Sequence, residues 1–301
     1  MFLEKIESTG NDVLLATVES LENESFPITF NDLSNLAKKS CDRNFGIGAD
    51  HLILLDKPGL DRDEFHGYQS DNNAHVRMIF FNSDGSSAEM SGNGIRCFAL
   101  FAMDNGFGEK DDNGNHFVVV ETLAGTRKIT FKTIGTQIYG DVNMGEVSFE
   151  PKDIPVNVED ALDVPTDILG KERKGYSANS GIPHWMLLVD SKEELESSLL
   201  DQEALAARYD ERFPNNTNVD IVYIENENSV NARYFERGAK ETLSCGTGVT
   251  ATAAMLNKVG LASTNVEVNV KGGKLFASKQ EDGTWVLSGP VQKIARCEFY
   301  L

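Results

Sequence analysis

The sequence predicts an α+β protein of two pseudo-symmetric domains, each a curved, mostly antiparallel sheet around a central helix. Three observations support this prediction. The chain has 301 residues, of which 40% are hydrophobic, enough to fill two cores. Runs typical of strands outnumber runs typical of helices. Segments of the first half recur in the same order in the second half, as expected of a duplicated fold.

The repeat has a nearly constant spacing in the sequence. Two pairs of matching segments are 154 positions apart, as are the glycines that close the helix-like stretches after them, Gly106 and Gly260. Two more pairs keep the same order with small changes in spacing. The matching segments join residues 80–82 to 234–236, 91–95 to 245–249, 48–50 to 218–220, and 141–145 to 285–289. Because five ordered matches are far more informative than one shared dipeptide, we interpret the chain as two copies of one fold.

Each half shows the same order of predicted elements. Alternating apolar and polar residues predict strands at 76–81, 117–121 and 128–132, then at 221–225, 230–235 and 266–270. Alanine-rich segments that begin with glycine predict helices at 94–104 and 248–258, and further helices are expected at 30–40 and 192–209. The polar segment 55–74 is expected to be a surface loop.

The domain boundary is expected near residues 146–155, where Pro151 and Pro155 interrupt regular structure. We therefore predict an N-terminal domain at 1–148 and a C-terminal domain at 149–289. The last segment, 290–301, is too short to form a domain, so we expect it to return to the N-terminal half as a strand.

The composition disfavours several classes of function. Lys and Arg total 28 against 47 Asp and Glu, which gives a formal charge of −19. This charge disfavours binding to nucleic acid or to an anionic membrane. No apolar run is long enough to span a bilayer, and the first residues do not resemble a signal peptide, so we expect a cytoplasmic protein. The four cysteines have neither disulfide-rich nor metal-ligand spacing, so no metal is expected.

A glycine-rich turn at Cys245 has the sequence expected of an anion-binding helix start. Gly246 and Gly248 allow backbone amides to approach a ligand closely, and the helix that follows contributes a positive dipole end. Such a turn can bind a carboxylate. A thiol there is expected to have a lowered pKa, so Cys245 should react first with an alkylating reagent. A buried cysteine beside an ordinary turn is the alternative.

The repeat places a second such turn at Ser91, followed by Gly92, Asn93 and Gly94. If the two domains close on one crevice, residues 91 and 245 face opposite sides of a ligand. This arrangement suits inversion of a carbon centre, in which one residue removes a proton and the other delivers one. Backbone amides would stabilise the enolate-like carboxylate that develops. The sequence shows no dinucleotide or P-loop motif, so no cofactor is expected.

These motifs resemble the diaminopimelate epimerase family along nearly the whole chain. The resemblance rests on six segments in the family's order: residues 5–12, 81–86, 181–184, 213–219, 236–242 and 245–248. It implies Cys245 as a catalytic cysteine, His184 as a supporting histidine and Glu236 as a third catalytic group. It also implies a small amino-acid substrate and a homodimer. The substrate-binding residues implied are Asn11, Asn82, Gly92, Asn93, Asn218, Glu236, Arg237, Gly246 and Thr247.

The chain departs from the family at its first catalytic motif. The family pattern there is C-G-N-G-x-R-C, whereas this chain has Ser91 first and Cys97 last. Because a hydroxyl is a much poorer base than a thiol, the change is expected to lower activity. Three explanations remain open: an introduced Cys→Ser change, a natural lineage that uses serine, or drift to a one-base reaction such as elimination. Ile182 and His51 are smaller departures that concern substrate fit.

The leading hypothesis is an isomerase that converts L,L-diaminopimelate to the meso form. The enzymatic alternative is a racemase, epimerase or dehydratase that acts on another amino acid with a Ser/Cys pair. The alternative from another class is a catalytically silent amino-acid-binding protein. Retention of Cys245, His184 and Glu236 disfavours the silent protein, because a binding protein has no need of a thiol at a helix start.

Overall fold

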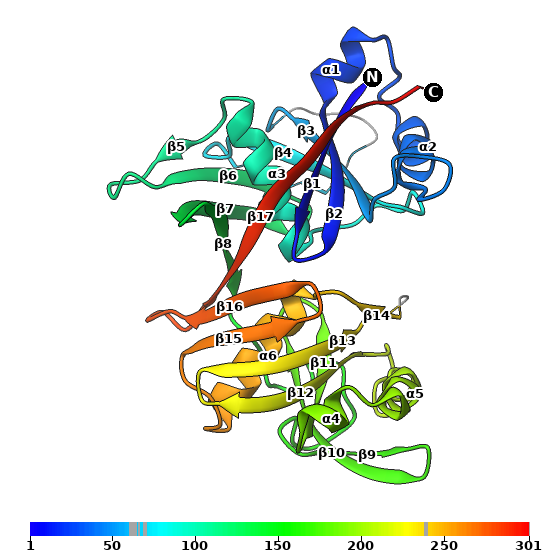
Figure 1. Ribbon diagram of the computed structural model, residues 1–301, viewed down its shortest axis with the longest axis vertical. Coiled ribbons are helices and arrows are strands. Elements are labelled where there is room, and N and C mark those ends of the chain that lie inside the picture. Colours follow the sequence, from blue (N-terminus) through cyan, green and yellow to red (C-terminus); the bar gives the residue numbers. More distant parts are fainter. Residues whose placement is uncertain (60–64, 66, 69–70, 238–239, 301) are drawn as a thin grey trace. The chain divides into compact units, whose positions relative to one another are not determined.

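A computed structural model describes residues 1–59, 65, 67–68, 71–237 and 240–300. The chain divides into two compact units. The first unit comprises Met1–Val142 together with Gly289–Leu301, and the second comprises Asn143–Ser288. Each unit holds a sheet and its own helices (Figure 1).

The first unit contains a mixed sheet in the order β17-β1-β2-β3-β4-β6-β7-β8, with the short β5 added beside β6. The final strand β17 (Trp285–Glu298) runs antiparallel to β1, with Leu3 opposite Cys297. The other elements are β1 (Phe2–Ser8), β2 (Asn11–Thr17), α1 (Val18–Asn23), α2 (Phe30–Cys41), β3 (His51–Asp56), β4 (Val76–Asn82), α3 (Gly92–Asp104), β5 (Glu109–Lys110), β6 (His116–Thr122), β7 (Gly125–Ile134) and β8 (Gln137–Gly145).

The second unit contains a sheet in the order β9-β10-β11-β12-β13-β15-β16-β17, with the short β14 added beside β13. Here β17 contributes its first residues, and Trp285 lies opposite Lys279. The other elements are β9 (Val164–Ile168), β10 (Lys171–Asn179), β11 (Pro183–Val189), α4 (Lys192–Leu195), α5 (Ser198–Ala207), β12 (Asn218–Asn226), β13 (Ser229–Phe235), β14 (Glu241–Thr242), α6 (Gly246–Lys258), β15 (Asn265–Val270) and β16 (Gly273–Lys279).

The two sheets have one topology. Across each sheet, successive neighbours pair antiparallel, antiparallel, parallel, antiparallel, parallel, antiparallel and antiparallel. In both, the second parallel pair flanks a crossover through the longest helix, α3 or α6. The prediction of a duplicated α+β fold is therefore confirmed.

Strand register corrects one of the sequence matches. Leu52 lies opposite Phe81 in the first unit, and Val219 lies opposite Phe235 in the second. Phe81 and Phe235 are equivalent in the repeat, so Leu52 is equivalent to Val219. Residues 48–50 therefore correspond to 215–217, and the match to 218–220 is wrong. One aspartate shared by chance does not define register, whereas hydrogen-bonded strand partners do.

Each sheet curves around its own central helix. Helix α3 contacts β1, β2, β3, β6 and β7, and α6 contacts the five equivalent strands, β10, β11, β12, β15 and β16 (Figure 1). Every residue of α3 from Gly92 to Ala102 is buried. A helix that is covered on all sides holds its N-terminus firmly against the strand ends. Residues of that N-terminus can therefore act from fixed positions.

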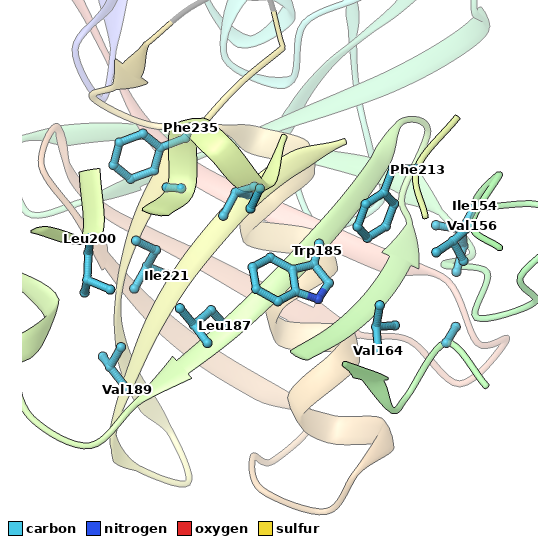
Figure 2. Close-up of a cluster of buried hydrophobic side chains, with 14 of the residues drawn as sticks. Ile154, Val156, Val164, Trp185, Leu187, Val189, Leu200, Phe213, Ile221 and Phe235 are labelled. Atoms are coloured by element: carbon cyan, nitrogen blue, oxygen red, sulfur yellow. The ribbon is translucent and has the colours of Figure 1, made fainter. Parts of the chain in front are cut away.

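The main hydrophobic core of the second unit packs against β11, the strand that carries His184. Trp185 on β11 lies among Leu187, Val164 and Phe213 (Figure 2). A β-carbon added to Gly175 on β10 would overlap the Trp185 ring, so only glycine fits beside the indole. Packing of this kind fixes β11 in place, and His184 precedes Trp185 directly.

The predicted helices differ from the structure in detail. Helices α3 and α6 begin two residues earlier than expected, because Ser91 and Cys245 each cap the helix with a side-chain acceptor. The predicted helix at 192–209 is two helices, since α4 ends at its C-cap Glu196 and Ser197 caps the start of α5. Helix α1 was not predicted, because its six residues are too few to show a periodic pattern. Residues 55–56 belong to β3, and part of the predicted 55–74 loop lies outside the described residues.

Candidate active site

The N-terminus of α6 in the second unit is built on Cys245. This residue has extended backbone angles (φ −132°, ψ 112°), and its sulfur accepts a hydrogen bond from the Gly248 amide at 3.4 Å. A β-carbon on Gly248 would lie 2.5 Å from the Tyr234 ring and 3.2 Å from His184. The glycine thus allows the helix start to approach β13 and the imidazole closely.

The N-terminus of α3 in the first unit repeats this geometry. Ser91 has similar backbone angles (φ −135°, ψ 129°), and its hydroxyl oxygen accepts from the Gly94 amide at 3.1 Å. The two caps therefore differ mainly in the capping atom, which is oxygen in one unit and sulfur in the other. Each helix start directs its positive dipole end toward the capping residue.

Side chains from three elements meet at Cys245. The Cys245 sulfur lies 3.3 Å from the Thr247 hydroxyl, which lies 3.1 Å from Nε2 of His184. On the other side of the imidazole, Nδ1 of His184 lies 2.9 Å from a carboxylate oxygen of Asp220. His184, Asp220 and Cys245 are buried. Asp220 is a site residue that the sequence analysis missed.

Asn218, Glu236 and Arg237 lie around the same cluster. The Arg237 amide donates to Oδ1 of Asn218 at 2.8 Å, and Nδ2 of Asn218 lies 3.5 Å from Nε2 of His184. A carboxylate oxygen of Glu236 accepts from the Thr242 hydroxyl at 2.7 Å. Among the predicted residues of the second half, His184, Asn218, Arg237, Cys245 and Thr247 are thus linked by hydrogen bonds.

The expected acidity of the Cys245 thiol is wrong. Burial raises the pKa of Cys245 well above its ordinary value, and the carboxylates of Glu236 and Asp220 raise it further. Hydrogen bonds from Thr247 and Gly248 oppose this rise without reversing it. Burial also raises the pKa of Glu236 and of Asp220. A helix dipole is outweighed here because desolvation acts on the whole thiolate charge. The resting site favours a neutral thiol.

The first unit has a different set of charges around its helix start. The guanidinium of Arg96, fully buried within α3, donates through Nη2 to the Asn93 side chain and through Nε to the Ser8 hydroxyl at 3.1 Å. Burial lowers the pKa of Arg96 to about 10, which leaves it cationic near neutral pH. The Ser8 hydroxyl in turn donates to the Pro290 carbonyl at 2.6 Å. Asn93 is therefore held by a buried cation.

Asn11 and Asn82 lie at the ends of neighbouring strands in the first unit. Nδ2 of Asn11 donates to Asp50 at 2.8 Å and lies 3.4 Å from Nε2 of His51. His51 is paired in register with Asn82, whose Nδ2 donates to the Ser86 hydroxyl at 2.9 Å. Burial lowers the pKa of His51. Asn11, His51 and Asn82 thus present neutral hydrogen-bonding groups beside the Asp50 carboxylate.

Register shows how the two units have diverged. Ile53 pairs with Phe80, and Asp220 pairs with Tyr234, so Ile53 holds the position of Asp220 in the repeat. Asn82 likewise follows Phe81 as Glu236 follows Phe235. Both carboxylates near Cys245 thus have neutral counterparts in the first unit. Within the described residues, no group of three or more His, Cys, Asp or Glu is placed to hold a metal ion.

Comparisons with known proteins show one family by sequence and a shared fold by structure. A model of the diaminopimelate epimerase family matches residues 6–150 and 176–294. A diaminopimelate epimerase of Alkaliphilus metalliredigens is 35% identical over 97% of this chain and 95% of its own length. One of Caldanaerobacter subterraneus is 36% identical over 98% and 97%. A solved structure of a probable proline racemase from Agrobacterium radiobacter has a TM-score of 0.67 at 15% identity, covering 100% of this chain and 93% of that chain, which indicates a shared fold.

Proposed function

Because the chain belongs to the diaminopimelate epimerase family, we propose that it inverts one α-carbon of L,L-diaminopimelate to give the meso isomer. The observation that carries the proposal is the buried cluster at the start of α6. There a thiol, an imidazole and two carboxyl groups meet beside a helix N-terminus. A cluster with proton donors and acceptors and a carboxylate-binding turn has what α-proton exchange requires.

The proposed reaction moves one proton on each face of the α-carbon. Cys245, as thiolate, takes the α-proton, and the C–H electron pair enters the substrate's carboxylate to form an enediolate. Ser91, directly or through a bound water, delivers a proton to the opposite face and restores the carboxylate. Backbone amides at residues 92–93 and 246–247 would stabilise the charge on the enediolate oxygens. In the reverse reaction the two residues exchange roles.

We further propose roles for the polar residues of both units. Glu236 and Arg237 would recognise the distal amino-acid end of the substrate, and Asn11, Asn82 and Asn218 would hold its polar groups. The hydrogen bond at Asn218 supports this role, because the Arg237 backbone amide already orients the Asn218 side-chain amide. The reaction would use protein groups without a cofactor, in a cytoplasmic homodimer. Among the described residues, no helix is long and apolar enough to cross a membrane.

The second candidate is a racemase, epimerase or dehydratase of another amino acid. Ser91 favours it, because a serine at this helix start departs from the family's cysteine motif. This candidate keeps the role of Cys245 and changes the substrate or the number of proton-transfer groups. Elimination would need only one base, so the weaker acid–base group at residue 91 would not limit it.

The test is a substrate panel resolved by chiral chromatography. Purified protein is incubated with L,L-diaminopimelate, L-proline, trans-4-hydroxy-L-proline and L-serine. We expect meso-diaminopimelate from the first and no isomer from the others. The matched control is Cys245→Ala, which should abolish the reaction while leaving the fold intact. Isomerisation or dehydration of another amino acid, without turnover of diaminopimelate, would favour the second candidate.

A further inference from the structure

The Thr247 hydroxyl bridges two titratable side chains of the second unit. It lies 3.3 Å from the Cys245 sulfur and 3.1 Å from Nε2 of His184. Beyond the imidazole, Nδ1 of His184 lies 2.9 Å from Asp220. An unbroken series of hydrogen-bonding atoms therefore joins the thiol to a buried carboxyl group. Three of its members are buried and Thr247 is half-buried.

Asn218 sets the direction of this series. Its Oδ1 accepts from the Arg237 amide at 2.8 Å, so Nδ2, which can only donate, faces Nε2 of His184 at 3.5 Å. This contact favours the tautomer in which Nε2 is unprotonated and Nδ1 carries the proton that it donates to Asp220. The Thr247 hydroxyl is free to donate to Nε2 and to accept from the Cys245 thiol. Cys245, Thr247 and His184 then each donate one hydrogen bond, and all three bonds run in the direction of Asp220.

We propose that Thr247, His184 and Asp220 form a proton relay that takes up the Cys245 thiol proton and returns it. As the S–H bond breaks, its proton forms an O–H bond at Thr247. The original Thr247 hydroxyl proton leaves and forms an N–H bond at Nε2 of His184. The products are a thiolate at Cys245 and an imidazolium at His184, whose Nδ1 proton stays in place beside the Asp220 carboxylate. Reversal of the same steps restores the thiol.

The surroundings of the sulfur explain why a relay is useful. Glu236 and Asp220 face Cys245 as carboxyl groups, and Tyr234 lies nearby with a pKa that burial raises well above its ordinary value. A thiolate formed among these groups is unfavourable unless a positive charge forms with it. An imidazolium at His184 supplies that charge between the thiolate and Asp220. Glu236 is the competing acceptor, since it also lies near the sulfur.

In this scheme the Thr247 hydroxyl and Asp220 are positioning groups that act through His184. The relay deepens the proposed function, because it would supply the thiolate that removes the α-proton. It is nevertheless a property of the protein without substrate. Its test can therefore follow the Cys245 thiol alone, so a failure of diaminopimelate turnover and a failure of the relay are distinguishable.

The test measures the rate at which iodoacetamide alkylates Cys245, resolved by mass spectrometry of its peptide, as a function of pH. Thr247→Val keeps the shape of the side chain and removes the bridge, and Thr247→Ser keeps the hydroxyl. We expect Thr247→Val to slow alkylation near neutral pH by about tenfold, which is one unit of thiol pKa. Thr247→Ser should recover most of that loss.

Asp220→Asn separates a relay from a simple charge effect. Removal of a carboxylate near the sulfur by electrostatics alone lowers the pKa of Cys245 and speeds alkylation. Loss of the relay instead slows it, because Asn donates to Nδ1 and leaves a proton on Nε2. We expect slower alkylation in Asp220→Asn, and the double variant with Thr247→Val should be no slower than Thr247→Val alone.

Two outcomes would overturn the relay. One is faster alkylation in a folded Asp220→Asn variant. The other is an unchanged rate in Thr247→Val together with a large fall in Glu236→Gln, which would assign the thiol proton to Glu236. If Asp220→Asn does not fold, the Thr247 pair decides the matter, because residue 247 is half-buried and both replacements are close in size.

Discussion

Replacement of Ser91 by cysteine should raise the rate of diaminopimelate epimerisation. The geometry of the two helix caps supports this replacement, because Ser91 and Cys245 have similar backbone conformations. Each side chain also accepts a hydrogen bond from the backbone amide three residues later. A thiol ionises near pH 8.5, far below a hydroxyl. The positions equivalent to Glu236 and Asp220 are Asn82 and Ile53, so the new thiolate would not face the carboxylates that oppose ionisation of Cys245.

The expected gain is at least about tenfold in kcat, or about 1.4 kcal/mol of barrier. The KM should change little, because the carboxylate contacts are backbone amides. Loss of the oxygen cap should lower the free energy of unfolding by about 1 kcal/mol or less. Initial rates of meso-isomer formation from the L,L substrate measure the first two quantities, and urea unfolding measures the third.

Ser91→Ala is the matched control, since it removes the proton donor and the cap without adding a thiol. It should lose activity, whereas Ser91→Cys gains it. An unchanged rate in Ser91→Cys, from a starting protein that is already fast, would show that serine is a competent partner. A pair of thiols would then not be needed for fast epimerisation, although the family assignment would stand.

Three further predictions concern the second unit and the cysteines. Gly248→Ala should lower the free energy of unfolding by about 1–3 kcal/mol, because its β-carbon would lie 2.5 Å from the Tyr234 ring; a change of the urea midpoint too small to detect would contradict that close approach. Burial raises the pKa of Glu236, so the stability that this group contributes is present below its unfolded pKa and is lost as pH rises through the folded value. The free energy of unfolding of Glu236→Gln should therefore rise relative to that of the original chain between acidic and neutral pH. If urea titrations show the same difference between the two proteins at every pH, this prediction is wrong. Iodoacetamide should label Cys297 before Cys41, Cys97 and Cys245, because Cys297 is half-buried and the others are buried; peptide mapping that finds Cys245 first would restore the original expectation.

Much of the fold could be predicted from the sequence, because the same elements occur in both halves of the chain. Matching segments at a fixed spacing located both central helices and the strands that precede them, and local patterns were sufficient for these long elements. Helix α1 and the break between α4 and α5 could not be predicted, since single capping residues such as Thr17 and Ser197 decide them. Register likewise depends on strand partners, which sequence matches of three residues do not fix.

The candidate site was only partly predictable. The motifs predicted the site residues at the helix starts and strand ends. The pKa of Cys245 could not be predicted, because it depends on how deeply the sulfur is buried and on which carboxylates lie near it. Asp220 could have been found, because it lies two residues after Asn218 on one strand and so shares its face. The hydrogen bond from Arg96 to Ser8 joins segments far apart in the chain, so only the folded structure shows it.

The central claim is that this protein inverts the α-carbon of diaminopimelate by proton transfer at Cys245. The most direct measurement is incubation of L,L-diaminopimelate with the protein in D₂O, with deuterium at the α-carbon followed by mass spectrometry and the isomers separated. We predict meso-diaminopimelate that carries one deuterium at the inverted carbon, with both inversion and exchange lost in Cys245→Ala. Absence of both deuterium and meso product from the original protein, or their persistence in Cys245→Ala, would contradict the claim.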